Sequence, residues 1–457
     1  MKACAAKRIA LFLLCVVLLA LYAAPAQLAK GDPAPAVSFE ERLLYGGTAL
    51  DIGDSVYYSA PDGLRVRKYG ATEESSRLVA DIQAAYLCIV IETQMTMESK
   101  AYRQQGIMGL FDKEDTLEKL NQMGNPLDKL AKVIDFEMFR ETLETGLHKE
   151  RMTNAGAKAY DPVLMFKILV LQRMYHLSDA QTEYQIRDRI TFRDFLGLAS
   201  GDRVPDQNTV WLFREELTKR QLFERLFDRF YQFLEENHLI MNEGVIIDGS
   251  FVDVPRQRTT REENKKIKDD KGDELWQEEE SDSDKEKKHK ANKRRHKDIH
   301  AKWTKKGGEK HYGYKNHVKA DGKSKFIKKG VTTHAATHDS KPTKDLVDDS
   351  DNGQELHADS AYIGKGVKRI MRKHNMKDRV IKRSVKGKKI SKRQETINRK
   401  NSKTRVRVEH IFGFCEQSLH GMFSRLIGFA RNAAFNTLTN LVYNMSRYEE
   451  VVRLGIN

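Results

Sequence analysis

The sequence predicts a protein of the mixed α/β class, in which a helical module precedes a region built on a β-sheet. From Asp112 to Leu239, apolar residues recur three and four positions apart and Gly and Pro are scarce, a pattern typical of amphipathic helices. From Val245 onward, short apolar runs end at turn residues, which indicates buried strands. The chain has 457 residues, of which 40% are hydrophobic, so it is long enough for two or three domains.

Residues 1–26 have the three parts of a secretory leader. Basic residues near the start precede an apolar run over residues 9–24, and the small residues 24–26 (Ala-Pro-Ala) follow. The run is shorter than the roughly 20 residues that span a bilayer, so a transmembrane anchor is the weaker interpretation. A translated leader of this kind argues for export or membrane association.

Residues 27–94 are predicted to be a truncated fragment joined to an independent protein. The stretch 59–80 (SAPDGLRVRKYGATEESSRLVA) weakly resembles the opening strand and turn of bacterial Src-homology-three-like wall-binding domains, and the composition turns helical near 95–100. A start codon placed too far upstream would explain the fragment equally well. The alternative is a genuine exported domain.

The rest of the chain is predicted to be cytoplasmic and to bind a polyanion. The four cysteines of the whole chain lack a paired spacing, which excludes a disulfide framework and a cysteine zinc site. Lys and Arg number 80 against 65 Asp and Glu, a net charge of +15. Such an excess favours nucleic acid as a partner.

Residues 97–240 form the predicted helical DNA-binding module. Asp161 before Pro162 predicts an N-cap and a first turn, and Ser178 predicts the start of the next helix. Two helices joined by so short a turn are compatible with a helix-turn-helix, and an ordinary helical bundle is an equal alternative. Polar side chains for DNA contacts lie along the second helix: Gln181, Gln185, Arg187 and Arg189.

A further helix pair is predicted over residues 206–219 and 221–237, and a last helix over 437–452. The pair carries aromatic residues for a core: Trp211, Phe213, Phe223, Phe227, Phe230 and Phe233. The last helix has one apolar face, which predicts a core or subunit contact.

Two aspartates follow predicted strands. The run 245–247 ends at Asp248 and Gly249, where the simpler alternative is an Asp closing a strand before a turn. Asp253 is a rival to Asp248, but five residues further on it points to the opposite strand face. A short strand over 356–358 likewise precedes Asp359 and a basic helix near 365–373.

Between these two strands, residues 311–338 predict two antiparallel strands about the Asp321-Gly322 turn. They extend the same sheet. The stretch KNHVKAD is a minor alternative for the His-Asn pair of a metal nuclease, but it lies inside a strand.

A third carboxylate, Glu409, lies on a predicted helix beside its apolar stripe, with Arg405 one turn earlier. Glu409, Asp248 and Asp359 can converge on one point. Three carboxylates can hold two hard divalent cations about 3.5 to 4 Å apart, one activating the attacking water or 3′-hydroxyl and the other stabilising the leaving oxygen. The sequence therefore predicts phosphodiester chemistry.

Four motifs resemble those of bacterial insertion-sequence transposases of the DDE type, in the insertion-sequence-five group: VIIDGSFVDVP, KHYGYKNHVKAD, LHADSAY and RVRVEHIFGF. Residues 107–144 also resemble that group's amino terminus, and the resemblance covers roughly 97–457. It places the catalytic and metal-binding triad at Asp248, Asp359 and Glu409. It implies an RNase H-like core over 241–457, a mixed five-stranded sheet flanked by helices, with two Mg²⁺ or Mn²⁺ ions.

The sequence departs from the wider superfamily at two positions of the signature around Glu409. A Tyr often lies three residues before the Arg and a Lys seven residues after the Glu, where this chain has Ser402 and Glu416. Arg405 remains as a candidate to hold a phosphate near the scissile bond. A surface salt-bridge arginine is the alternative.

Two charge-rich stretches differ in kind. The insertion 256–306 mixes both signs, which is typical of a solvated, mobile loop, although Trp276 and Trp303 could stack on bases or pack that loop. Residues 361–407 hold 19 Lys and Arg against two acids, a charge of +17 that exceeds the net +15 of the whole chain.

The basic segment lies between the second and third carboxylates, where it can neutralise phosphates with little sequence preference. A loop is predicted at residues 387–389. The candidate DNA-binding residues are Arg405, Arg407, Lys382, Arg383, Lys388, Lys389, Lys392 and Arg393.

The predicted function is that of a DNA transposase that cleaves transposon ends and transfers the strands into target DNA. Its partners would be double-stranded DNA, as terminal inverted repeats and target, and further copies of the chain in a synaptic homo-oligomer at the nucleoid, with no small-molecule substrate. One alternative is a metal-dependent nuclease without strand transfer. The other is a non-catalytic exported or DNA-binding protein.

Overall fold

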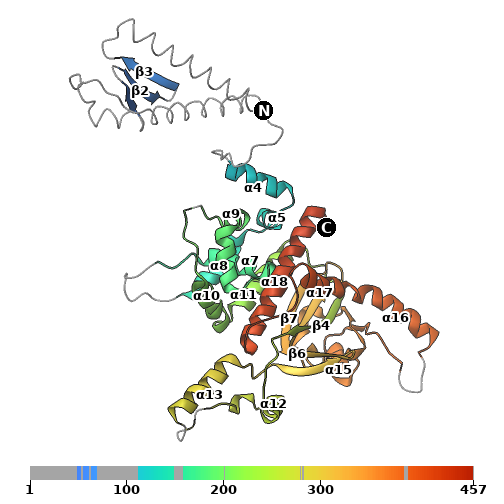
Figure 1. Cartoon of the computed structure of the whole chain (residues 1–457). Coiled ribbons are helices and arrows are strands. Elements are labelled where there is room, and N and C mark those ends of the chain that lie inside the picture. Colours follow the sequence, from blue (N-terminus) through green and yellow to red (C-terminus); the bar gives the residue numbers. More distant parts are fainter. Residues whose placement is uncertain are drawn as a thin grey trace, which may run out of the picture. The chain divides into compact units, whose positions relative to one another are not determined.

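The computed structural model describes residues 49–52, 55–60, 63–68, 112–148, 158–199, 201–277, 279, 283–384 and 390–455. The chain divides into two compact units, Met1–Ile107 and Met108–Asn457 (Figure 1). The predicted leader 1–26 lies outside the described residues. None of the helices in the described part of the chain is long and apolar enough to span a membrane.

The first unit contains a three-stranded antiparallel sheet in the order β1-β2-β3. Its strands are β1 (Ala49–Ile52), β2 (Ser55–Ala60) and β3 (Gly63–Lys68). The predicted strand and turn within 59–80 coincide with the end of β2 and with β3. Whether this sheet is a fragment of a wall-binding domain stays a prediction.

The second unit begins with helices. They are α4 (Asp112–Gln122), α5 (Pro126–Val133), η1 (Phe136–Phe139), α6 (Arg140–Leu147), α7 (Pro162–Met174), α8 (Asp179–Asp188), α9 (Ile190–Leu196), α10 (Gln207–Lys219) and α11 (Leu222–Glu236). Of these, α7, α8, α10 and α11 start within a residue of the predicted positions. Asp161 caps α7 by accepting hydrogen bonds from the amides of Val163 and Leu164. Ser178 forms a capping box with Gln181 at the start of α8.

The aromatic core of this module is confirmed except at one position. Phe223, Phe227 and Phe230 are buried, whereas Trp211 is 43% exposed. The prediction for Trp211 was wrong because α10 turns Val210 and Leu217, which are fully buried, toward the core and leaves the next position outward.

The sheet of the second unit has a mixed topology. Five strands lie in the order β7-β6-β4-β8-β9, with β4 antiparallel to β6 and parallel to β8. They are β4 (Val245–Asp253), β6 (Glu309–Asp321), β7 (Ile327–His334), β8 (Glu355–His357) and β9 (Lys377–Asp378). The predicted hairpin about Asp321 is confirmed as β6 and β7.

A sixth strand, β5 (Lys302–Lys306), corrects the prediction of five. It pairs antiparallel with the start of β6. Gly307 and Gly308 both adopt positive φ, as a tight two-residue hairpin turn requires. Across the pair, the rings of Trp303 and Tyr312 lie 4.8 Å apart.

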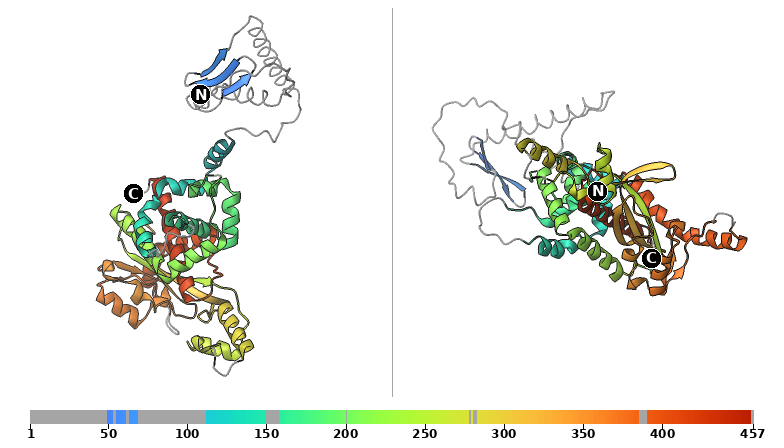
Figure 2. Two further views of the ribbon diagram at one scale, coloured as in Figure 1. Left: turned by 90° about the vertical axis from the view of Figure 1, so that its left-hand side faces the viewer. Right: turned by 90° about the horizontal axis from the view of Figure 1, so that it is seen from below.

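Helices cover both faces of this sheet (Figures 1 and 2). One face packs Ile246, Val318 and Ala320 against α17 (Arg407–Gln417) and α18 (Phe429–Leu454). The other packs Val245 and Ile247 against α15 (Lys365–Lys373). The remaining short elements are α14 (Thr343–Leu346), η3 (Asp349–Asp351), η4 (Ser360–Tyr362) and α16 (Lys392–Arg405).

Helix α18 joins the helical module to the sheet. It is longer than predicted, and its prediction as a core helix is confirmed because it contacts α5, α7 and α11 on one side and β7 on the other. Asparagines at every fourth position form a buried polar seam: Asn432, Asn436, Asn440 and Asn444. Asn440 exchanges hydrogen bonds with Asn316 of β6 (2.7 and 3.2 Å), and Asn444 bonds the main chain of Ile327.

The charged insertion is helical where the structure describes it, which corrects the expectation of a mobile loop. It contains α12 (Arg261–Lys268), η2 (Gly272–Glu274) and α13 (Asp284–His296). Capping boxes start both α-helices, and Lys and Glu are good helix formers. Trp276 packs within it, with Nε1 donating to Glu263 at 2.9 Å.

Candidate active site

Asp248 lies in the middle of β4, not at its end as the sequence predicted. The strand continues to Asp253 because β6 pairs along its whole length. On the other side, β4 pairs in parallel with β8 only as far as Ile246 opposite His357. The same register carried two residues further brings Asp248 beside Asp359, so both lie at the carboxyl end of the parallel pair.

The two aspartates have different surroundings. Asp359 caps η4 by accepting a hydrogen bond from the Ala361 amide at 2.8 Å. Burial raises the pKa of Asp248 to about 6, and the negative charge of Asp359 adds to this. A hydrogen bond from the Gly249 amide and the charge of Arg405 oppose the rise. The Gly249 amide and the charge of Arg405 therefore do not offset the effect of burial on the pKa of Asp248.

Arg405 links Asp248 to Glu409. Helix α16 ends at Arg405 and α17 begins at Arg407, so the guanidinium and Glu409 lie side by side across the junction. Arg405 Nη1 lies 3.2 Å from Asp248 Oδ2, and Nη2 donates to Glu409 Oε1. The Arg405 and Asp248 side chains are 19% and 16% exposed, whereas Glu409 is 55% exposed, so the bridge runs from a partly buried carboxylate to one at the surface.

Among the described residues, no three His, Cys, Asp or Glu side chains are grouped closely enough to hold a metal ion. The guanidinium of Arg405 provides positive charge between two of the three carboxylates. Carboxylate oxygens are nevertheless the ligands that Mg²⁺ and Mn²⁺ prefer. The pKa of Asp248 stays raised despite the nearby charge of Arg405, which also fits a site that accepts a cation.

Tyr362 is a neighbour that the sequence reasoning did not single out. Its side chain is 1% exposed and its hydroxyl has no hydrogen-bond partner among the described residues. Burial raises its pKa well above the ordinary value, as do the charges of Asp248, Asp339 and Asp359. The only sequence signal was its place in LHADSAY, three residues after Asp359. An orphaned buried hydroxyl beside carboxylates is a further polar group available to the site.

Behind Asp248, on the other face of β4, lies a second group of polar residues, two of which belong to the stretch KNHVKAD that was weighed as a minor alternative site. His317 packs on Gly249, where a Cβ would lie 2.6 Å from His317 Nδ1, so only glycine allows this approach. His317 Nε2 lies 2.8 Å from Thr333 Oγ1. Lys315 Nζ donates to Asp339 at 2.7 Å. This group supports the strand that positions Asp248.

His317 makes the fold sensitive to acid. Burial lowers the pKa of His317 to about 4, from 6.5 in an unfolded chain. Between these values the unfolded chain binds a proton that the folded protein does not, so stability is lost as the pH falls from about 6.5 to 4. A His317→Gln variant, which cannot ionise and can still bond Thr333, should lose less of its free energy of unfolding over this window, by about 3 kcal/mol. Denaturant titrations at pH 7 and 4.5 measure the difference; parallel losses in both proteins would contradict it.

The candidate DNA-binding residues divide into three groups. Lys382, Arg383, Lys392 and Arg393 are exposed, and α16 projects away from the sheet (Figure 1). Arg407 instead donates to the carbonyl of Gly322 and ties α17 to the β6–β7 turn. Lys388 and Lys389, with the predicted loop 387–389, lie outside the described residues.

Asp253, the rival of Asp248, lies elsewhere. Its side chain is 49% exposed and its Oδ2 is 3.4 Å from His311 Nδ1. Its main chain pairs with Met422 and Ser424 beyond the end of α17. Asp253 is thus five residues away along β4 from the point where Asp359 and Arg405 approach Asp248.

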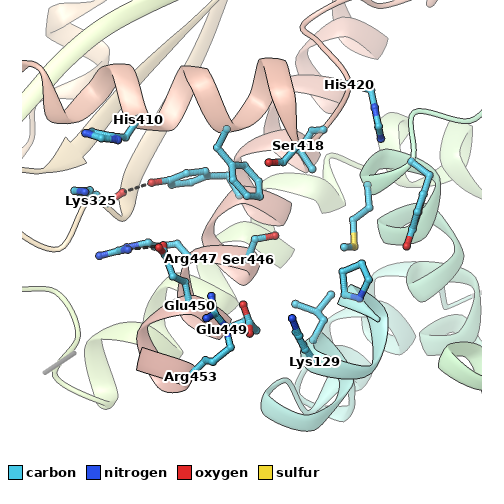
Figure 3. Close-up of a pocket in the computed structure, with 17 residues that line it drawn as sticks. Lys129, Lys325, His410, Ser418, His420, Ser446, Arg447, Glu449, Glu450 and Arg453 are labelled. Carbon is cyan, nitrogen blue, oxygen red and sulfur yellow. Dashed lines mark hydrogen bonds and ion pairs between the residues drawn. The ribbon is translucent and has the colours of Figure 1, made fainter. Parts of the chain in front are cut away.

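A cavity of about 610 Å³ is lined by His410 and Phe414 of α17 together with residues of other helices (Figure 3). Phe414 and Tyr443 form its wall, with their rings 5.6 Å apart, and Tyr443 donates to the carbonyl of Lys325 at 3.0 Å. Arg447 and Arg453 at its edge are paired with Glu450 and Glu449. None of the three carboxylates lines this cavity.

The mixed sheet flanked by helices, with acidic residues at the carboxyl end of its parallel pair, defines an α/β enzyme with an RNase H-like core. The chain belongs to the DDE transposases of insertion sequences: a family model described as Transposase DDE domain matches residues 241–445, and one described as Transposase domain (DUF772) matches residues 115–216. The protein is a DNA transposase, and DDE transposases generally depend on divalent metal ions. The nuclease and non-catalytic alternatives are not favoured.

Among solved structures, the chain is similar to the piggyBac transposase in its synaptic complex with hairpin DNA. The two are 12% identical, with a TM-score of 0.34, and the match covers 73% of this chain and 76% of that chain.

Proposed function

We propose that Asp248, Asp359 and Glu409 are the catalytic, metal-binding residues of this transposase. The observation that carries the proposal is the register of β4 and β8, which brings Asp248 beside Asp359, together with the Arg405 bridge to Glu409. Two Mg²⁺ or Mn²⁺ ions held by these carboxylates would activate the attacking water or 3′-hydroxyl and stabilise the leaving oxygen.

The side chains around the triad have supporting roles in this proposal. Arg405 holds Asp248 and Glu409 together in the free protein and turns toward a phosphate oxygen when the carboxylates take other ligands. The Tyr362 hydroxyl, which has no partner among the described residues, is available to donate a hydrogen bond to a neighbouring carboxylate once the carboxylates rearrange around bound ligands. Above pH 6 Asp248 is ionised and able to act as a ligand.

The exposed cations of the basic segment position the DNA in this proposal. Lys382, Arg383, Lys392 and Arg393, with Lys388 and Lys389, contact the phosphates of the transposon end and the target. The helical module recognises the terminal inverted repeat, with α8 as the candidate recognition helix because Gln181 and Arg187 are exposed on it. The chain acts as a homo-oligomer in a synaptic complex at the nucleoid.

The domain organisation of the proposal follows the sequence. Residues 97–240 form the DNA-binding module and 241–457 the catalytic domain with its charged insertion 256–306, while 1–94 have no part in the reaction. A chain shortened to residues 95–457 should therefore retain full activity.

A joining assay tests the proposed reaction. The purified chain is incubated with labelled DNA that carries the element's end and with a supercoiled target plasmid, in Mg²⁺, in Mn²⁺ and in excess chelator. We expect cleavage that exposes a 3′-hydroxyl, followed by labelled plasmid, and neither product in chelator. Cleavage without joined plasmid would support the nuclease alternative, and cleavage in chelator would refute the metal-dependent mechanism.

A further inference from the structure

A concave surface lined by arginine side chains lies between the helical module and the charged insertion. None of the three proposed catalytic carboxylates lines it. One part, of about 500 Å³, is lined by residues that include Trp211 of α10, Arg295 of α13 and Phe423. The adjoining part, of about 250 Å³, is lined by Arg256, Arg258 and neighbours. Arg425, Leu426 and Ile427 line both parts, so the two form one trough.

Two of the aromatic side chains that line this trough are exposed to solvent. Trp211 is 43% exposed and Phe423 is 37% exposed. Near the other end, Trp303 is 44% exposed, and the Arg256 guanidinium lies 5.5 Å from its ring centre. Large exposed rings in a concave surface mark a binding site more often than single exposed rings on a convex one.

The trough carries free positive charge. Its acids are already neutralised: Arg214 pairs with Asp179 at 2.6 Å, and Arg431 with Glu215 at 2.7 Å. By contrast, Arg295 and Arg425 have no ion-pair partner among the described carboxylates. Burial lowers the pKa of His176 in the wall, and the charges of Arg173, Arg425 and His420 lower it further. Both observations indicate a positive potential.

The remaining acid that lines the trough is Asp298, which is held by hydrogen bonds from neutral groups. Its carboxylate is 2% exposed and accepts hydrogen bonds from the Tyr314 hydroxyl and from the amides of His300, Ala301 and Gly428. These bonds fix the end of the insertion to β6 and to the start of α18. The wall of the trough is therefore held in place by buried contacts.

We propose that this trough binds unpaired DNA, with bases stacked on Trp211 and Phe423 and phosphates held by Arg295 and Arg425. Exposed aromatic rings together with unpaired guanidiniums suit a single strand. Every base has a face that can stack on a ring, and every phosphodiester linkage carries a negative charge that a guanidinium can bind. Duplex DNA is read by elements that project into its grooves, whereas a hollow admits only a base that has left its stack. The site is separate from the basic segment 361–407, and the proposal needs DNA as the substrate but not the triad assignment.

Equilibrium binding to the full chain tests this proposal. The probes are a fluorescein-labelled oligothymidylate strand and a duplex of equal length. Trp211→Ala and Phe423→Ala should each weaken single-strand binding by about tenfold and leave duplex binding within about twofold of wild type. Leu212→Ala is the matched control, since Leu212 is 57% exposed on the same helix and does not line the trough.

Two further measurements test whether the single strand contacts Trp211 and Arg425 directly. In a chain with Trp276→Phe and Trp303→Phe, the fluorescence of Trp211 should be quenched by the single strand and not by the duplex. Arg425→Gln should reduce the salt dependence of single-strand binding by about one counterion. Unchanged single-strand affinity in both aromatic variants, or an equal loss for strand and duplex, would overturn the proposal. Because binding is measured without cleavage, an inactive Asp248→Asn chain should give the same results, which separates this test from that of the triad.

Discussion

An Asp248→Asn variant is expected to lose DNA cleavage by about a thousandfold or more, because it replaces a carboxylate that we propose as a metal ligand by a neutral amide at the carboxyl end of the β4–β8 pair. Glu409→Gln should have a loss of the same order. Binding of duplex DNA should stay within a few fold of wild type in both, since we propose that the phosphate contacts come from the basic segment. Cleavage of an end-labelled substrate and a binding titration measure the two effects. Full cleavage in both variants would refute the triad.

The same substitution is expected to raise the stability of the fold, and that result would exclude misfolding as the cause of lost activity. The pKa of Asp248 is about 6 in the folded protein and 3.8 in an unfolded chain. Ionised Asp248 therefore destabilises the metal-free fold at pH values above 6, and this cost disappears as the pH falls below about 4. Asp248→Asn should raise the free energy of unfolding at pH 8 by up to about 3 kcal/mol and leave it unchanged at pH 4. A lower stability at pH 8 would contradict the assigned burial of this carboxylate.

An Asp351→Asn variant is expected to destabilise the catalytic region by about 3–5 kcal/mol. Asp351 is fully buried and lies 2.8 Å from Lys319 Nζ and 3.2 Å from Lys328 Nζ, and both lysine side chains are 2% exposed. Lys319 keeps Asp348 as a partner at 2.7 Å, but Lys328 keeps only the neutral Asn242 oxygen at 2.9 Å. The substitution leaves the buried Lys328 ammonium without a counter-charge. Chemical denaturation measures the resulting loss in the free energy of unfolding.

Two further variants make the Asp351 result specific. Asp349→Asn is the matched control, because its carboxylate is 99% exposed and should change stability by less than about 1 kcal/mol. Adding Lys328→Met to Asp351→Asn removes the unpaired charge and should restore a large part of the loss. Equal effects of Asp349→Asn and Asp351→Asn would mean that the buried cluster does not stabilise the fold.

Much of the fold could be predicted because it depends on neighbours in the sequence. Asp161, Ser178 and Asp206 start their helices as predicted, since a capping side chain bonds amides two or three residues away. The Asp321-Gly322 turn likewise predicted the β6–β7 hairpin. The insertion was mistaken for a mobile loop because its mixed charge was given more weight than its two capping boxes.

The outward position of Trp211 could not be predicted in this way. The face of α10 that packs depends on α8 and α18, which the helix contacts only in the folded protein. The sixth strand was missed for a similar reason. Residues 302–306 have no apolar alternation and are held as a strand by pairing with β6.

For the site, the sequence alone determined which residue types are present: two acids after apolar strand residues, one acid on an amphipathic helix, and a basic segment between them. Only the tertiary structure decided their partners. Arg405 meets Asp248 across 157 positions of sequence, and His317 and Tyr362 approach the site through contacts that no local pattern records. The physical reason is that caps and periodicity act within one or two turns of chain, whereas charge compensation and burial depend on distances that exist only after the sheet and its helices have packed.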